Sequence, residues 1–327
     1  MKKIVIYNET LLSGGIEKCI ELLSKSLCDK YEIEVVYDDK SNILDENIVN
    51  IISKYAKVHK LKDNEIVYGD YCIFCRLYLD TERLMEQIKA KKYYLWAHSK
   101  PRALDNCVLD DTDFINKIDK IICVSKCVEN EVNIPDKTMV IHNFIDDNIE
   151  EKSNEYVSDN FDENKLNLLI VSRLSQEKGF DRVKKIINTL IDHNIDFNLK
   201  IIGKGRTYEE PLKNELKKYN QVEFLGYKEN PFPYIKNADY LLTLSDYETW
   251  GNTISEAKSI GTPCIVTNFP SAIEQIEDNV NGIIIPLECQ DYYAYLDNLK
   301  GRSKIYKENL KDFKYENEID SWIKILE

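Results

Sequence analysis

Glycine is scarce in this chain, which holds 11 glycines among 327 residues, about half of the roughly 7% that is usual in proteins. Such a chain is expected to keep glycine where the backbone needs unusual geometry or a ligand comes close. Long apolar runs are missing as well, since no window approaches the roughly 18 apolar residues of a membrane-spanning helix. The apolar run Ile4–Tyr7 is too short for the hydrophobic region of a signal peptide. The sequence therefore predicts neither a spanning helix nor a secreted protein.

A concentration of positive charge is also lacking. The formal net charge is −13; residues 1–150 carry 21 basic and 27 acidic side chains, and residues 151–327 carry 23 and 30. Because contact with nucleic-acid phosphates needs a basic face, nucleic-acid binding is not expected. Two stretches without acids, 48–62 and 87–104, fit either a solvated lysine-rich face or a patch for anionic lipid headgroups. The lysines proposed for such a patch are Lys54, Lys57, Lys60, Lys89, Lys91 and Lys92.

The nine cysteines are odd in number and scattered, which favours reduced thiols and a cytoplasmic protein over a disulfide framework. Cys72 and Cys75 could form a zinc site with Cys123 and Cys127. However, Cys72 and Cys75 lie in a strand-like run, where residues three apart point to opposite faces. Convergent thiolates, which zinc requires, are therefore not expected, and core cysteines are the favoured interpretation.

Short apolar runs alternate with amphipathic, helix-like segments along the whole chain. The alternation predicts parallel sheets built from βαβ units. A polar, acidic stretch at 147–165 without apolar periodicity is interpreted as a linker. The expected strands are 3–7, 32–37, 71–75, 93–97, 120–124 and 138–142 before the linker, and 166–171, 197–202, 222–226, 240–244, 263–267 and 282–286 after it.

The fold class is therefore predicted as α/β, with two Rossmann-like parallel-sheet domains facing a central cleft. The expected domains are 1–150, 151–312 and a C-terminal helix within 313–327 that could pack back on the first domain. Ligands of open parallel sheets bind at the carboxyl ends of the strands. Most of the glycines follow strands in this way, namely Gly14, Gly15, Gly179, Gly203, Gly205, Gly226 and Gly251. Turns between strands and helices favour glycine in any case, and this accounts for part of the set.

Several catalytic signatures are absent. The segment Leu12–Glu17 lacks the full G-x-G-x-x-G dinucleotide fingerprint, and neither a P-loop nor a G-x-S-x-G nucleophile turn occurs. What remains at Gly14 and Gly15 is a glycine turn that opens a helix, which suits an anion or a close substrate.

The most informative segment is 245–268. Its spacing places Glu248 in the loop after a strand and Glu256 in the first turns of the next helix. The N–H groups of Asn252 and Thr253 would then point into the same space, where they suit a phosphate or a sugar hydroxyl. Carboxylates accept hydrogen bonds from vicinal hydroxyls, so a polyol ligand is chemically sensible. The alternative is two surface carboxylates near a helix start.

The order of motifs resembles glycosyltransferase family 4, the retaining, nucleotide-sugar-dependent group with the GT-B fold. The resemblance covers nearly the whole chain and is most specific in its second half. It is carried by Arg173, Lys178–Gly179, the Gly203–Gly205 loop, Gly226, the Glu248-x7-Glu256 pair and Gly261, with looser matches at Gly14–Gly15, at His98 and at the hinge-like segment 142–146.

The resemblance implies a role for each matching residue. Arg173 and Lys178 would neutralise the donor diphosphate, Glu256 would bind the ribose hydroxyls and Glu248 would contact the donor sugar. The loop of Gly251, Asn252 and Thr253 would meet sugar and phosphate, and Gly14 and Gly15 would close over the diphosphate. Gly203, Tyr227 and Lys228 belong to the donor side, where Tyr227 and Lys228 would meet the base; His98 would lie near the transferred sugar, its alternative being a buried core histidine.

Two positions depart from the family pattern. Phe144 stands where the hinge signature usually has glycine, and Lys204 stands where an acid is common. Asp111-Thr112-Asp113 resembles the metal-binding D-x-D triplet of GT-A glycosyltransferases. Because it precedes an apolar helix-like run, it is interpreted as a helix-capping cluster.

The resemblance implies a retaining hexosyl- or N-acetylhexosaminyltransferase without a cofactor or an obligatory metal. The donor would be a nucleotide-sugar, with a UDP-sugar favoured. The acceptor would be a glycan or a lipid-linked glycan of bacterial capsule, exopolysaccharide or lipopolysaccharide synthesis, at the inner face of the plasma membrane. Two alternatives stay open: a non-hydrolysing UDP-sugar 2-epimerase and a non-catalytic sugar-nucleotide-binding subunit.

Overall fold

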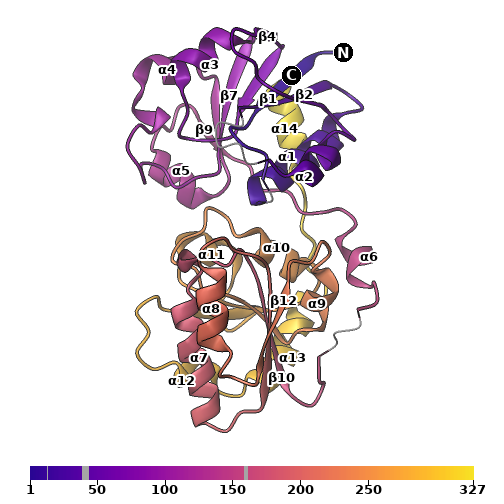
Figure 1. Cartoon of the computed structure of the whole chain (residues 1–327), viewed down its shortest axis with the longest axis vertical. Helices are drawn as coiled ribbons and strands as arrows, with labels where there is room; N and C mark the ends of the chain where they lie inside the picture. Colours follow the sequence, from indigo (N-terminus) through magenta and orange to yellow (C-terminus); the bar gives the residue numbers. More distant parts are fainter. Residues whose placement is uncertain (13, 39–43, 158–160) are drawn as a thin grey trace. The chain divides into compact units, whose positions relative to one another are not determined.

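The computed structural model describes residues 1–12, 14–38, 44–157 and 161–327. It divides into two compact units, the first formed by residues 1–144 with 317–327 and the second by residues 145–316. Each unit is built around its own parallel sheet (Figure 1). None of the helices in the described ranges combines the length and apolarity needed to cross a membrane.

The sheet of the first unit has the strand order β3-β2-β1-β5-β7-β8-β9, and every neighbouring pair is parallel. A small additional sheet pairs β4 with β6. The strands are β1 (Lys3–Tyr7), β2 (Glu32–Tyr37), β3 (Lys57–Lys60), β4 (Val67–Tyr68), β5 (Tyr71–Phe74), β6 (Ile88–Lys89), β7 (Lys92–Ala97), β8 (Lys120–Cys123) and β9 (Thr138–Val140).

Helices connect these strands. The first unit contains α1 (Gly15–Leu27), α2 (Glu46–Ile52), α3 (Thr81–Gln87), the 3₁₀ turn η1 (Val108–Asp110), α4 (Thr112–Lys117), α5 (Lys126–Val132) and α14 (Ile319–Leu326). Asp111 is the N-cap of α4, where its side chain accepts a hydrogen bond from the Phe114 N–H at 3.0 Å. The interpretation of the Asp111–Asp113 triplet as a capping cluster is therefore confirmed.

The last helix belongs to the first unit although it ends the chain (Figure 1). Trp322 on α14 is fully buried and packs edge-on against Trp96 of β7, with ring centroids 4.8 Å apart. The Tyr94 hydroxyl donates to the Ile325 carbonyl at 2.5 Å. Phe144, which stands at a hinge-signature glycine, is also buried and meets the Trp96 ring edge-on. These contacts explain the amphipathic pattern of the C-terminal residues.

The sheet of the second unit has the order β12-β11-β10-β13-β14-β15, again with only parallel pairs. Both sheet faces are covered, so strands read as continuous apolar runs. In β10, Leu166, Leu168 and Ile170 face one core and Leu169 faces the other. The strands are β10 (Leu166–Val171), β11 (Phe197–Ile202), β12 (Val222–Gly226), β13 (Tyr240–Thr243), β14 (Cys264–Thr267) and β15 (Gly282–Ile285).

The helices of the second unit lie on both faces of its sheet. They are α6 (Ile149–Ser153), the 3₁₀ turn η2 (Gln176–Lys178), α7 (Phe180–Asp192), α8 (Glu209–Leu216), α9 (Phe232–Asn237), α10 (Asn252–Ser259), α11 (Pro270–Gln275), α12 (Tyr293–Leu296) and α13 (Leu299–Leu310). The predicted α/β class with two Rossmann-like parallel sheets is thus confirmed. The expected cleft between the two domains stays a prediction.

Two expectations were wrong. The stretch 147–165 is not linker throughout, because α6 forms within it and buries Ile149 against residues of α9; a single turn is too short to show periodicity. Residues 158–160 of this stretch lie outside the described residues. The expected strands also omitted β3, β4 and β6. The apolar pattern did not reveal them, because β3 is only partly buried and the other two span two residues each.

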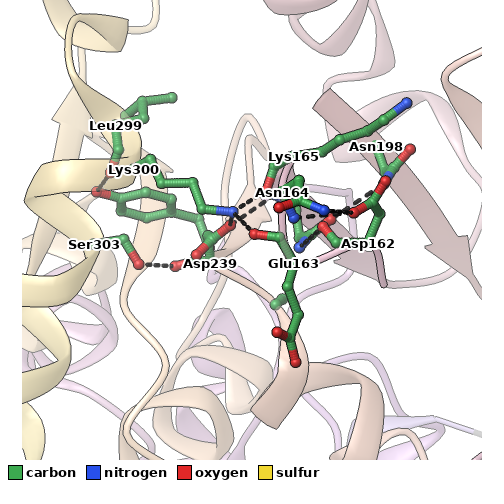
Figure 2. Close-up of polar contacts among 12 residues, drawn as sticks. Asp162, Glu163, Asn164, Lys165, Asn198, Asp239, Leu299, Lys300 and Ser303 are labelled. Carbon is green, nitrogen blue, oxygen red and sulfur yellow. Dashed lines mark hydrogen bonds and ion pairs between the residues drawn. The ribbon is translucent and has the colours of Figure 1, made fainter. Parts of the chain in front are cut away.

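At the amino-terminal edge of the second sheet, Lys300 of α13 joins three segments (Figure 2). Its ammonium group donates to the carbonyls of Glu163, at 2.6 Å, and Lys165 and lies 3.6 Å from the Asp239 carboxylate. One helix turn on, Ser303 donates to the Asp239 carbonyl at 3.0 Å. These bonds anchor α13 at the edge opposite the strand carboxyl ends.

Candidate functional site

The segments that follow β10 and β11 approach each other so closely that only glycine fits after β11. Gly203 has a φ of +145°, and a Cβ there would lie 1.8 Å from the Ser172 carbonyl oxygen. A Cβ on Gly205 would lie 2.3 Å from the Leu174 carbonyl oxygen. Gly203 N–H also donates to the Gly226 carbonyl at 2.9 Å. The backbone segments that carry these glycines therefore lie directly against one another.

The loop after β10 is fastened to the loop after β13. Gly179, with a φ of +71°, lies so close to the residue after β13 that a Cβ would be 1.9 Å from the Leu244 carbonyl oxygen. The buried Arg182 donates to the same carbonyl at 2.9 Å and pairs with Asp246. Asp246 N–H donates to the Glu177 carbonyl at 3.0 Å. This fastening brings residues 177–179 next to residues 244–248.

Lys178 and Glu248 form an ion pair at this junction. Lys178 Nζ lies 2.6 Å from Glu248 Oε1, and the Ser245 hydroxyl donates to the same carboxylate oxygen at 2.7 Å. Both side chains are largely buried, with 15% and 20% of their surfaces exposed. The structure thus brings together a cation and a carboxylate that the sequence separates by 70 positions.

Arg173 lies at the same strand end but is much more exposed, with 67% of its side-chain surface accessible. Its guanidinium is 3.3 Å from Glu177 Oε1, which also accepts from the Ser175 hydroxyl at 2.7 Å. Burial favours a raised pKa for Glu177, but Ser175 and the nearby Arg173 and Lys178 outweigh it and hold the pKa below its usual value. Glu177 therefore stays ionised between the two cations.

The loop after β13 leads into α10 through Gly251, which has a φ of +84° at the N-cap. Asn252 and Thr253 begin the helix, so their N–H groups belong to its open amino end. Glu256 follows one turn later on a half-buried position. Gly261, with a φ of +80°, follows the last residues of the helix, a position that favours glycine. The arrangement offers backbone donors and a positive helix end to an anionic ligand.

Tyr227 and Lys228 follow β12. Tyr227 is 53% exposed, and Lys204 from the loop after β11 holds its ammonium group 4.9 Å from the Tyr227 ring centroid. Lys228 lies similarly over the Tyr234 ring at 5.5 Å. An exposed aromatic ring at a strand end is suited to stacking with a planar ligand group.

In the first unit, Gly14 is the extended N-cap of α1 and Gly15 is its first residue, and both are exposed. Ser13 of the predicted glycine turn lies outside the described residues. A Cβ on Gly14 would lie 2.8 Å from Glu17 Oε2. The carboxylate of the buried Glu17 therefore lies directly beneath the glycine turn.

Sequence reasoning missed the cluster that surrounds this carboxylate. Asn8, which follows β1, donates to Glu17 Oε1 at 3.0 Å, and Arg76, which follows β5, donates to Asn8 Oδ1 at 2.8 Å and lies 3.5 Å from Glu17. Burial raises the pKa of Glu17 despite these donors. The signal was available, since Asn8 and Arg76 each follow an apolar run, where parallel sheets bind ligands.

His98 follows β7 and is buried, with its ring against Trp96 at a centroid distance of 4.3 Å. Burial, together with the positive charge of Arg76, lowers the pKa of His98 to about 3. The imidazole is therefore neutral at ordinary pH, when it can donate or accept a hydrogen bond but carries no charge.

Two of the lysines proposed for a lipid-facing patch have acidic partners. Lys57 Nζ lies 2.6 Å from Glu34, and Lys91 Nζ lies 2.7 Å from Asp70. The Lys89 ammonium group donates to the Met85 carbonyl at 2.8 Å. The acidic partners of Lys57 and Lys91 therefore reduce the net charge of the patch.

Eight of the nine cysteines are buried and Cys28 is half-buried, and all nine are free thiols. Burial raises the pKa of Cys72 and of Cys75, which opposes the thiolate form that binds metal. Within the described ranges, no cluster of three or more histidine, cysteine or acidic side chains is arranged to hold a metal ion.

The chain is similar to known glycosyltransferases. Residues 151–308, just under half of the chain, match the family model described as "Glycosyl transferases group 1". An uncharacterized glycosyltransferase of Methanocaldococcus jannaschii is 29% identical over 60% of this chain and 54% of its own length. The chain spans only about half of the length of such curated relatives.

A longer match links the chain to Campylobacter jejuni. The N-acetylgalactosamine-N,N'-diacetylbacillosaminyl-diphospho-undecaprenol 4-alpha-N-acetylgalactosaminyltransferase of this bacterium is 24% identical over 89% of this chain and 88% of its own. Among solved structures, HepE of Anabaena in complex with UDP and glucose has a TM-score of 0.79 at 16% identity, with 99% of both chains covered. This likeness confirms that the fold is of the GT-B type.

Proposed function

We propose that this protein is a retaining glycosyltransferase that moves a sugar from a UDP-sugar to a hydroxyl group of a glycan or lipid-linked acceptor. The observation that carries the proposal is the Lys178–Glu248 ion pair beside the amino end of α10, within the segment that matches the glycosyltransferase family. Cation, carboxylate and helix N–H groups at one strand edge are what a sugar diphosphate requires.

In the proposed reaction, Arg173, Lys178 and the N–H groups of Asn252 and Thr253 hold the donor diphosphate. The bond between the sugar C1 and the diphosphate oxygen breaks while the acceptor oxygen bonds to C1 on the same face. The departing phosphate oxygen takes the acceptor's proton, so the products are UDP and a glycoside with retained configuration. Stabilising the charge that develops on the leaving group would supply most of the rate.

Glu248 and Glu256 would recognise hydroxyl groups of the donor, Glu248 on the sugar and Glu256 on the ribose. Tyr227, Lys228 and the loop at Gly203 would meet the base. A carboxylate accepts from two neighbouring hydroxyls at once, and the Ser245 hydroxyl fixes the orientation of Glu248. These assignments follow the family resemblance, and the strand-end positions of the residues support them.

The first unit would bind the acceptor. The exposed Gly14–Gly15 turn leaves room for a diphosphate to approach the backbone. The neutral His98 is suited to a hydrogen bond with a sugar hydroxyl, because a charged imidazole would cost more to desolvate.

A lipid-linked acceptor at the cytoplasmic face of the membrane is the finer part of the proposal. The Campylobacter relative is named for a diphospho-undecaprenol acceptor. In the small β4–β6 sheet, Tyr68 is 65% exposed and lies in register with Lys89, a pairing suited to a headgroup region. If phosphatidylglycerol vesicles bind no more protein at low salt than phosphatidylcholine vesicles, the membrane contact is wrong.

The experiment is a panel of UDP- and GDP-sugars with nucleotide release measured alone and with lipid-linked acceptors. We expect release of UDP that the acceptor accelerates, a product with retained anomeric configuration by NMR, and strong losses for Lys178→Ala and Glu256→Ala. An epimerase would instead isomerise the UDP-sugar without releasing UDP, and a non-catalytic subunit would bind the donor without turnover. Either result, or no response to any donor, would overturn the proposal.

A further inference from the structure

The loop that carries Glu248 is held from behind by α11, through side chains outside the proposed site. The Ser271 hydroxyl donates to the Glu248 carbonyl oxygen at 2.8 Å, and the Gln275 amide donates to the Trp250 carbonyl oxygen. Ser271 is fully buried and Gln275 nearly so. Two successive turns of α11 thus fix two carbonyl groups of the loop Glu248–Gly251.

Gln275 is itself fixed in orientation. The Ser255 hydroxyl of α10 donates to Gln275 Oε1 at 2.7 Å, and Lys258, on the same helix, donates to the Gln275 carbonyl. Because the Trp250 carbonyl can only accept, the amide nitrogen of Gln275 has to face it. The Gln275 side-chain amide therefore links the Trp250 carbonyl, in the loop before α10, to Ser255 within α10, and only one orientation of the amide makes both bonds.

This link lies where the loop turns into the helix. Gly251 takes the left-handed conformation there, and a Cβ on it would lie 3.8 Å from Gln275 Nε2. A shift of the Trp250 carbonyl would therefore move Gly251 and, on the other side, Glu248. The N–H groups at the start of α10 and the Glu248 carboxylate depend on the same support.

We propose that Gln275 and Ser271 are positioning residues of the donor site. They hold the loop Glu248–Gly251 so that the Glu248 carboxylate meets the donor sugar while the N–H groups at the start of α10 meet the donor diphosphate. This inference rests on the proposed function. Neither residue contacts the donor; each acts through a backbone carbonyl of the loop.

The test compares Gln275→Met and Ser271→Ala with the wild type in the transfer assay. Because a displacement of about 1 Å at a reacting group can cost roughly a hundredfold, we expect kcat/KM to fall about ten- to a hundredfold, chiefly through kcat. The affinity for UDP, which keeps the diphosphate but lacks the sugar, should fall less than kcat/KM in titration calorimetry. Ser255→Ala should give a smaller loss that does not add to that of Gln275→Met, because both act through one amide.

Loop position is read directly by labelling the protein with 5-fluorotryptophan. Of the three tryptophans, Trp250 is the one in the second unit, and its ¹⁹F resonance should shift in Gln275→Met. Ser259→Ala is the matched control, because its hydroxyl bonds within α10, to the Ser255 carbonyl. This control should keep wild-type kcat, KM and resonance.

The inference is wrong if Gln275→Met keeps wild-type kcat and an unshifted Trp250 resonance. It is also wrong if the variant loses UDP affinity and melting temperature in proportion to its activity, because that result describes a general loss of structure. If the folded wild type releases no nucleotide from any donor, the proposed function fails instead. The Trp250 resonance then still reports whether Gln275 fixes the loop.

Discussion

Lys178 and Glu248 share one short ion pair, so each of the two charges assigned to the donor site neutralises the other. The pair is fixed by Ser245 on the carboxylate and by the close approach of Gly179 to the Leu244 carbonyl. A diphosphate that binds Lys178 has to compete with Glu248 for the same ammonium group. Removing the charge of Glu248 is therefore expected to strengthen UDP binding, whereas removing the charge of Lys178 is expected to weaken it.

The first prediction separates these effects. Glu248→Gln should bind UDP more tightly than the wild type, because Lys178 loses its competing partner, yet turn over the UDP-sugar more slowly. Lys178→Met should weaken UDP binding and lower kcat about 10²- to 10³-fold, as is typical when one donor to a developing anion is removed. Calorimetry with UDP and the nucleotide-release assay measure the two quantities.

Lys184→Met is the control for this pair, because Lys184 forms an ion pair of similar length with Glu215 on the surface of α7 and α8. It should leave UDP affinity and kcat unchanged. Weaker UDP binding by Glu248→Gln would contradict the competition between the carboxylate and the diphosphate.

A second prediction concerns two glycines that share a positive φ but differ in their surroundings. Gly261→Ala meets no atom within 4 Å, so it should cost only the left-handed strain of about 1–2 kcal/mol. Gly203→Ala would force a Cβ onto the Ser172 carbonyl oxygen, and should therefore cost more and displace the loop after β10. Urea unfolding and UDP titration check both variants; equal losses would show that the approach at Gly203 relaxes easily.

Much of the architecture was predictable because parallel strands buried on both faces leave continuous apolar runs. Strands β10, β11 and β12 were predicted to the residue. The glycines at their ends were also predictable, because a chain with 11 glycines has few of them in ordinary turns.

The support beneath the site was not predictable in the same way. Gln275 reaches Trp250 and Arg182 reaches Leu244 across 25 and 62 positions, and no local pattern marks a side chain that bonds a distant carbonyl. The Asn8–Glu17–Arg76 cluster is a further example, because it joins a helix to the ends of two different strands. Hydrogen bonds between residues so far apart in the sequence depend on the order of the strands in the sheet, which the apolar pattern does not predict.

A third prediction tests the anchor of α13 (Figure 2). Lys300→Met removes the donor to the Glu163 and Lys165 carbonyls and the partner of Asp239. Because these groups are partly accessible to water, we expect a loss of about 1 kcal/mol in the free energy of unfolding. Lys304→Met, an exposed position on the same helix, should stay within about 0.5 kcal/mol of the wild type. Urea unfolding followed by Trp250 fluorescence gives both values, and a loss as large in Lys304→Met would argue against a specific anchor.

The last prediction concerns acid stability. Burial and Arg76 lower the pKa of His98 to about 3 in the folded chain, whereas an unfolded histidine titrates near 6.5. Between these values the unfolded chain binds a proton that the folded chain does not, so the stability contributed at neutral pH is lost as the pH falls below about 6.5. The expected loss from this residue is of the order of 1.4 kcal/mol per pH unit.

His98→Asn removes this titration. Any deficit in the free energy of unfolding that the variant has relative to the wild type at pH 7.5 should shrink as the pH falls to 4.5. The difference shrinks because only the wild type loses stability by keeping the imidazole neutral. Unfolding can be followed by the fluorescence of Trp96, which packs against His98. A constant difference for His98→Asn over this range would mean that His98 takes up its proton in the folded chain, which would also remove the basis for a neutral imidazole in the acceptor site.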